Sequence, residues 1–121
     1  MKVVEFVNKV DNVVYDESIA NTIRSCYGGD VPDIVLQAIS LSPNGEFFDS
    51  DDVCRLLSLA EIVSATRELG VDFLKIRTIP LFDVGDNCFV CYNMALKCWE
   101  QYNIVDMISY GQKATLVEMF S

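Results

Sequence analysis

Three side chains with oxygen ligands crowd one predicted turn of this chain, and such ligands could bind a hard cation. They belong to Asp83, Asp86 and Asn87, which lie on either side of Gly85. A calcium loop would need more oxygen ligands at a regular spacing. Turn chemistry explains the same residues, because glycine supplies a positive φ and Asp and Asn side chains bond to nearby amides. We therefore favour a structural turn whose polar groups are also candidates for contact with a partner.

Cys88 and Cys91 have the C-x-x-C spacing that is found in zinc and redox sites. The chain has no histidine and no second cysteine pair of this spacing to complete a tetrahedral site. Phe89 and Val90 are strand formers, and strand residues three apart point to opposite faces, so the two sulfurs should not converge. The chain has five cysteines, which are Cys26, Cys54, Cys88, Cys91 and Cys98. We interpret them as reduced and mostly buried thiols, without zinc and without a disulfide.

Carboxylates along residues 46 to 52 could in principle share general acid and base work. The candidates for this work are Asp49, Asp51 and Asp52, and Glu46 belongs to the same acidic loop. However, histidine, the commonest general base, is absent, and no serine or cysteine has an evident activating partner. No glycine-rich loop that could cradle a phosphate occurs either. Because acidic runs are normally solvated, we interpret this segment as an exposed loop and predict no enzyme activity, no cofactor and no metal.

The excess of acidic side chains limits the class of partner. The 121 residues include 18 acidic and 9 basic side chains, which gives a net charge of -9. A nucleic acid or an anionic membrane surface would be repelled, whereas a basic protein would be attracted. The acidic loop and the turn at residues 83 to 87 are therefore the expected partner-binding surface.

Large aromatic side chains are further candidates for partner contact, because they dominate binding hot spots. Trp99, Tyr102 and Tyr110 are the candidates in this chain. In a strand that begins at Lys97, Trp99 and Tyr102 lie on opposite faces. We therefore expect at least one of these two to be partly exposed.

The composition indicates a folded domain that can position these groups. With 51% hydrophobic and 22% charged residues, the chain has a globular profile, and its length suits a single domain over residues 1–121. The longest apolar runs are too short or too interrupted by charge to cross a bilayer. Residues 1–11 lack the continuous apolar core of a secretory signal. We expect a cytoplasmic protein.

Helical spacing of apolar residues predicts three helices in the first third of the chain. The first covers residues 3–10, and the second runs from Ile19 to Tyr27 after Asp16. The third begins at Pro32, which suits a first helical position, and ends before a turn at residues 42–45.

Beyond residue 52 the pattern favours strands, interrupted by one helix. The predicted strands are Val53–Leu57, Phe73–Leu81, Cys88–Met94 and Lys97–Val105. Ser58 and Glu61 match a capping box for a helix that ends at Leu69, and a second match at Thr115 opens a short C-terminal helix. Consecutive strands joined by short turns imply an antiparallel meander. The expected fold class is α+β, an antiparallel β-sheet meander flanked by N-terminal helices, one central helix and a short C-terminal helix.

The string Ile-Pro-Leu-Phe-Asp-Val-Gly-Asp-Asn-Cys-Phe-Val-Cys-Tyr-Asn, from Ile79 to Asn93, resembles the signature of the SUKH superfamily. The family pattern has a strand end of Ile-Pro type, a turn that closes on Gly-Asp, and a strand that ends in Tyr-Asp or Tyr-Asn. Residues 85–86 and 92–93 fill those positions. Residues 55–62 and 116–120 are also similar to segments of the family, so the resemblance covers most of residues 53–120.

This resemblance implies a protein-binding role without catalysis. The superfamily includes fungal regulators of cell-wall glucan synthesis and many bacterial immunity proteins, which protect the producing cell by occupying a toxin. We therefore expect an immunity protein whose acidic surface docks on a basic toxin domain. The alternatives are a scaffold or regulator in cell-envelope synthesis and, third, a small enzyme.

Overall fold

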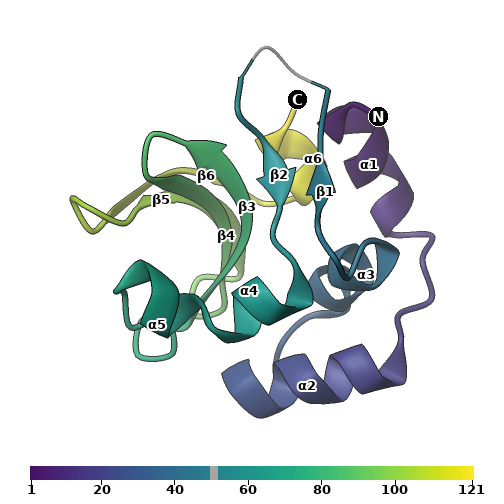
Figure 1. The fold of residues 1–121 in the computed structure, drawn as a ribbon, viewed down its shortest axis with the longest axis horizontal. Helices are drawn as coiled ribbons and strands as arrows, with labels where there is room; N and C mark the ends of the chain where they lie inside the picture. The colour runs from purple at the N-terminus through teal and green to yellow at the C-terminus, as the bar shows by residue number, and fades with distance from the viewer. Residues whose placement is uncertain (50–51) are drawn as a thin grey trace.

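Three amphipathic helices form the first part of the chain, as the sequence predicts. The computed structural model describes residues 1–49 and 52–121. The helices are α1 (Val3–Val10), α2 (Glu17–Tyr27) and α3 (Asp33–Leu41) (Figure 1). Asp16 caps α2, because its Oδ1 accepts hydrogen bonds from the amides of Ser18 at 2.7 Å and Ile19 at 3.3 Å. Pro32 lies just before α3 rather than at its first helical position, so the expected start is one residue too early.

In the part of the chain that the structure describes, six strands form one antiparallel sheet in which each strand pairs with the next along the chain. They are β1 (Glu46–Phe47), β2 (Arg55–Leu56), β3 (Thr78–Gly85), β4 (Cys88–Asn93), β5 (Cys98–Asn103) and β6 (Ile108–Lys113). This order confirms the expected meander and the α+β class. The sequence pattern does not predict the two edge strands, β1 and β6.

The helix expected from Ser58 to Leu69 is two short helices in the structure. They are α4 (Leu59–Val63) and α5 (Ala65–Leu69), which meet at Ser64. The Ser64 hydroxyl donates to the carbonyl of Ala60 at 2.9 Å, and such back-bonding bends helices. The capping box at Ser58 is confirmed. In the described part of the chain, no helix is long and apolar enough to cross a membrane.

All four predicted strands are shorter in the structure or begin elsewhere, although β4 differs only by ending at Asn93 rather than at Met94. β2 has only two of the residues expected at Val53–Leu57, and β5 is shorter than Lys97–Val105. Residues 73–77 form turns, so β3 begins at Thr78 rather than at Phe73. β3 then continues to Gly85, because the following turn is shorter than the sequence suggests.

Helices cover one face of the sheet, and the main core lies between them and the strands. On this face the Phe82 ring of β3 lies 6.3 Å from that of Phe6 in α1, centroid to centroid. It lies 4.9 Å from the ring of Phe120, which follows α6 (Leu116–Met119). On the opposite face, Phe73, just after α5, places its ring 6.1 Å from that of Tyr102. Figure 1 shows α1, α2 and α3 grouped on one side of the curved strands.

One carboxylate is buried within the sheet. Glu100 of β5 accepts a hydrogen bond at Oε1 from Asn93 Nδ2 of β4 at 3.1 Å. Its Oε2 accepts another from Gln112 Nε2 of β6 at 3.2 Å. The buried carboxylate is therefore bonded to both neighbouring strands, as a polar group removed from water requires.

Candidate partner-binding site

A cleft of about 690 Å³ lies at one end of the sheet, and both predicted acidic segments reach it. Asp52, in the connection between β1 and β2, lines the cleft together with Asp86, in the turn between β3 and β4. The strands β4, β5 and β6 contribute Cys88, Gln101 and Tyr110. The fold thus brings together acidic residues that are far apart in the sequence.

The turn that positions Asp86 has only two residues in its loop. Asp86 and Asn87 have φ values of 53° and 62°, and positive φ at both central positions is the turn preferred in tight hairpins. Gly85 has φ of 84°, which confirms the positive φ expected from the sequence. A register shift between Asp83 and Gly85 leaves Val84 as the extra residue of a bulge. Asp86 and Asn87 are both exposed, so the turn presents its polar groups to solvent.

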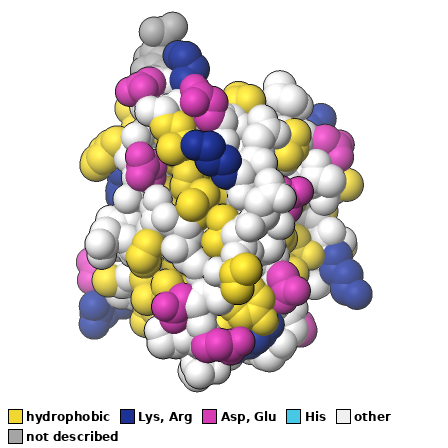
Figure 2. All heavy atoms as spheres, turned by 90° about the vertical axis from the view of Figure 1, so that its right-hand side faces the viewer, with side chains coloured by type: hydrophobic (Ala, Val, Ile, Leu, Met, Phe, Trp, Pro, Cys, Tyr) yellow, Lys and Arg dark blue, Asp and Glu magenta, His cyan; other side chains and the backbone are white. Residues whose placement is uncertain are grey.

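The cleft combines an acidic rim with an apolar lining. The apolar part includes Val53, Val84 and Phe120, and Val53 is 63% exposed. Among the described residues that line the cleft, none is a lysine or an arginine. A cationic side chain with an aliphatic stem would match this lining, with its charged head at Asp52 and Asp86 and its stem along the apolar residues. Figure 2 shows acidic, basic and hydrophobic side chains close together at the upper end of the molecule.

Asp49 and Glu46, two more members of the predicted acidic loop, contact other groups of the chain away from the cleft. Asp49 accepts a hydrogen bond at Oδ2 from the amine of Met1 at 2.8 Å, and this bond lowers the pKa of Asp49. Glu46 accepts one at Oε2 from the Ser42 hydroxyl at 3.2 Å. Neither residue lines the cleft. Asp51, which belongs to the same predicted surface, lies outside the described residues.

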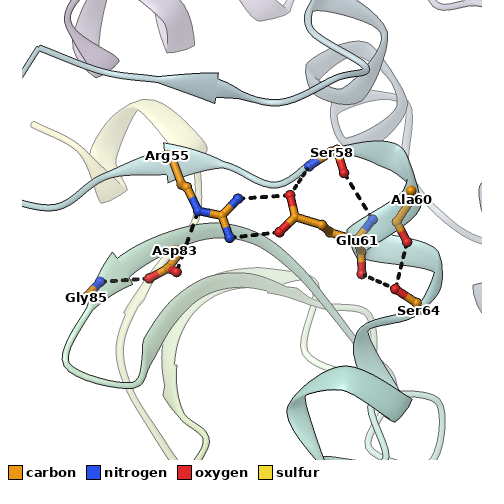
Figure 3. A network of polar contacts seen from close by, with 7 residues as sticks. All are labelled: Arg55, Ser58, Ala60, Glu61, Ser64, Asp83 and Gly85. Atoms are coloured by element: carbon orange, nitrogen blue, oxygen red, sulfur yellow. Dashed lines mark hydrogen bonds and ion pairs between the residues drawn. The ribbon is translucent and has the colours of Figure 1, made fainter.

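Asp83 belongs to a polar network centred on Arg55 of β2, which Figure 3 shows. Arg55 donates from Nη1 and Nη2 to the two carboxylate oxygens of Glu61, at 2.9 and 2.8 Å. Its Nε lies 3.8 Å from Oδ2 of Asp83, whose Oδ1 accepts the Gly85 amide at 3.0 Å. Asp83 therefore joins β2 to the bulge, and its carboxylate is engaged within the chain rather than offered to a partner.

The ion pair between Arg55 and Glu61 predicts a loss of stability in acid. The hydrogen bonds from Arg55 lower the pKa of Glu61 from 4.5 to about 2. Because folding favours the charged form, the stabilisation is complete above about pH 5 and is lost as the pH falls toward 2. We expect Glu61→Gln to lower the melting temperature at neutral pH, and the difference from wild type to shrink between pH 5 and about pH 2. The effect is modest, because 43% of the Glu61 side chain is exposed and solvent screens the pair.

Melting temperatures measured across this pH range test the expectation. Glutamine can still accept from the amide of Ser58, so the variant removes the charge and keeps the helix cap. Glu68→Gln is the matched control, because Glu68 is exposed and pairs only with the neighbouring Arg67 among the ion pairs of the described residues. A difference between Glu61→Gln and wild type that stays constant with pH would contradict the assignment.

Trp99 and Tyr102 are both buried, so the expectation that one of them is partly exposed is wrong. Their exposed fractions are 2% and 7%. They do point to opposite faces, but both faces are covered at this point. Trp99 packs against Tyr92 with ring centroids 5.2 Å apart, and Tyr102 packs against Phe73. Neither ring can anchor a partner on the folded surface.

Exposed apolar side chains lie elsewhere on the surface. Two of them, Phe47 and Val53, lie next to acidic residues of the loop and were not predicted as contact residues. Phe47 of β1 is 81% exposed, and Val53 lies at the cleft. Both flank acidic residues of the loop, and this mixture of apolar and acidic residues is the signal that could have identified them. Tyr110, the third aromatic candidate, is exposed and lines the cleft.

The two cysteines of the C-x-x-C motif face different surroundings. Cys88 Sγ lies 3.1 Å from the Tyr110 hydroxyl, a contact that raises the pKa of Tyr110. Cys91 lies on the other face of β4, opposite Glu100, and burial raises the pKa of its thiol. The described residues include all five cysteines, and no disulfide joins any of them.

We predict that all five thiols remain reduced and bind no zinc in the native protein. The reason is that zinc and disulfide chemistry both need thiolates that can converge, whereas burial raises the pKa of the thiols of Cys26, Cys54, Cys91 and Cys98 and so favours their neutral form. Mass spectrometry under native and denaturing conditions measures both outcomes. Stoichiometric zinc, or a mass lowered by disulfide formation, would overturn the prediction.

Comparisons of the chain with protein-family models, with curated proteins and with solved structures found no match.

Proposed function

We propose that this protein is a non-catalytic binding module that docks on a basic protein, and that it acts as an immunity protein by occupying a toxin. The main support for this proposal is the cleft at the end of the sheet. It unites carboxylates from two separate segments at the rim of an apolar lining, and no lysine or arginine is among its described lining residues. Exposed charges of this kind speed the encounter with an oppositely charged partner, and apolar contacts then hold the complex.

Two further observations support a basic protein as the partner. The net charge of -9 repels nucleic acids and anionic membranes and attracts basic proteins. The resemblance of Ile79–Asn93 to the SUKH signature supports a toxin in particular, because many bacterial members of that superfamily are immunity proteins. In the structure this string forms β3, the tight turn and β4, which supply Asp86 and Cys88 to the cleft.

The test of this proposal is the effect of the cleft charges on association. A partner is first captured from the native cell, and association rates are then measured for wild type and for the variant Asp52→Asn/Asp86→Asn. We expect the variant to associate about tenfold more slowly at low salt, with a smaller change in the dissociation rate. The difference should fade at high salt, because exposed charges are screened over about 8 Å at physiological ionic strength.

The matched control is Glu17→Gln/Glu68→Gln, which removes the same charge from exposed positions outside the cleft. Equal association rates for the cleft variant and wild type at low salt would contradict the proposed surface. The toxin role is tested by expressing the captured partner alone and together with this protein. Growth arrest that co-expression relieves supports immunity, and a partner that never inhibits growth contradicts it.

A further inference from the structure

The outer edge of β6 is open. β6 is the last strand of the sheet, and no other strand of the described chain pairs with it beyond β5. All six of its residues are exposed, including the large side chains of Ile108 and Tyr110. An uncovered edge presents a row of unpaired backbone amides and carbonyls, which is a template for another strand.

The charge pattern of β6 does not protect this edge. In natural proteins, charged side chains or proline often prevent an edge strand from pairing with another chain. β6 has neither until its last residue, Lys113, and it has no acidic residue although the chain carries 18. Gly111 lies where the register with β5 shifts, so the regular part of the edge is Ile108–Tyr110.

The open edge adjoins the acidic cleft. Tyr110 pairs across the ladder with Gln101, and both residues line the cleft from the same face of the sheet. A strand added outside β6 would place alternate side chains on that face, with Cβ atoms about 4.5–5.5 Å from those of β6. Such side chains would therefore enter the cleft beside Tyr110, and Asp52 and Asp86 line the same cleft.

We propose that an extended basic segment of the partner adds to β6 as a further antiparallel strand, and that its arginine or lysine side chains occupy the cleft. In this mode of recognition, main-chain hydrogen bonds supply affinity and alternate side chains supply specificity. The inference rests on the proposed function, because it takes the partner to be a basic protein. It adds how that partner is held.

Synthetic peptides that alternate arginine with threonine test the inference directly. In an antiparallel pair, the amides of alternate residues point to the same neighbouring strand. Two methylated forms are made, one with N-methyl groups at the arginines and one with them at the threonines. We expect one form to bind like the parent peptide and the other to bind at least about tenfold more weakly, because it loses main-chain hydrogen bonds. Replacing arginine by glutamate should abolish binding.

Amide hydrogen exchange, followed by NMR on the full chain, locates the peptide. With the parent peptide we expect new protection at those amides of residues 108–110 that point away from β5, and with the weakly binding methylated form we expect none. Equal affinity of both methylated forms, or unchanged protection of β6 at saturation, would overturn strand addition. If Asp52→Asn/Asp86→Asn still weakens the parent peptide in that case, the acidic cleft and the proposed function stand. A parent peptide that does not bind also overturns strand addition, and the association rates of the captured partner then decide the proposed function separately.

Discussion

Replacing Phe82 by alanine is expected to lower the free energy of unfolding by about 3–5 kcal/mol, the range for a buried phenylalanine. Phe82 is fully buried at the centre of an aromatic cluster. Its ring lies 6.3 Å from Phe6, 6.2 Å from Phe48 and 4.9 Å from Phe120, centroid to centroid. These rings come from α1, the β1–β2 connection and the end of the chain after α6, so the cavity left by alanine would loosen three segments at once.

Urea denaturation of the variant and of wild type measures the cost. Phe47→Ala is the matched control, because Phe47 is 81% exposed and its removal should change stability by less than about 0.5 kcal/mol. If both alanine variants proved equally stable, Phe82 would not be the centre of the core. Because Phe82 touches Phe120, which lines the cleft, the Phe82 variant should also disturb the candidate site.

The second large effect is expected from Gly85→Val, at about 1–3 kcal/mol. Gly85 has φ of 84°, where a β-branched residue is strained. A Cβ atom at this position would also lie 3.3 Å from Cβ of Val53, which is closer than side chains usually approach. The substitution therefore combines backbone strain with a crowded contact at the cleft.

Gly70→Val separates these two causes. Gly70 has φ of 71°, but a Cβ atom there would meet nothing within 4 Å. We expect both variants to melt below wild type, and Gly85→Val to melt lower than Gly70→Val. An unchanged melting temperature for Gly85→Val would mean that the turn tolerates the substitution by changing its conformation.

The helices could be predicted from the sequence because each has a strong local signal. The spacing of apolar residues in α1 and the Asp16 cap of α2 each involve only residues that are close together in the sequence. β6 carries only a weak signal, because its apolar and polar residues alternate only from Ile108 to Tyr110 and all of its side chains are exposed. The break at Ser64 depends on one hydroxyl that bonds to the preceding turn, which apolar spacing does not report.

The site was predictable only in part, for a related reason. Turn chemistry at Gly85 and the position of Asp86 follow from local sequence, and both are found in the structure. The burial of Trp99 and Tyr102 depends on segments far away in the chain, which cover both faces of β5. A strand pattern shows which side chains share a face, but not whether another element covers that face.

The hydrogen bonds of the Glu100 carboxylate depend on the register of three strands of the sheet. Its carboxylate finds a donor on β4 and another on β6 only when all three strands are correctly aligned. A slip of one residue would turn the side chains of the moving strand to the opposite face and would leave a carboxylate in the interior without donors, at a cost of several kcal/mol. Glu100 would thus destabilise sheets in which a strand pairs in a shifted register. It would thereby hold β6, the strand at the open edge, in a single register.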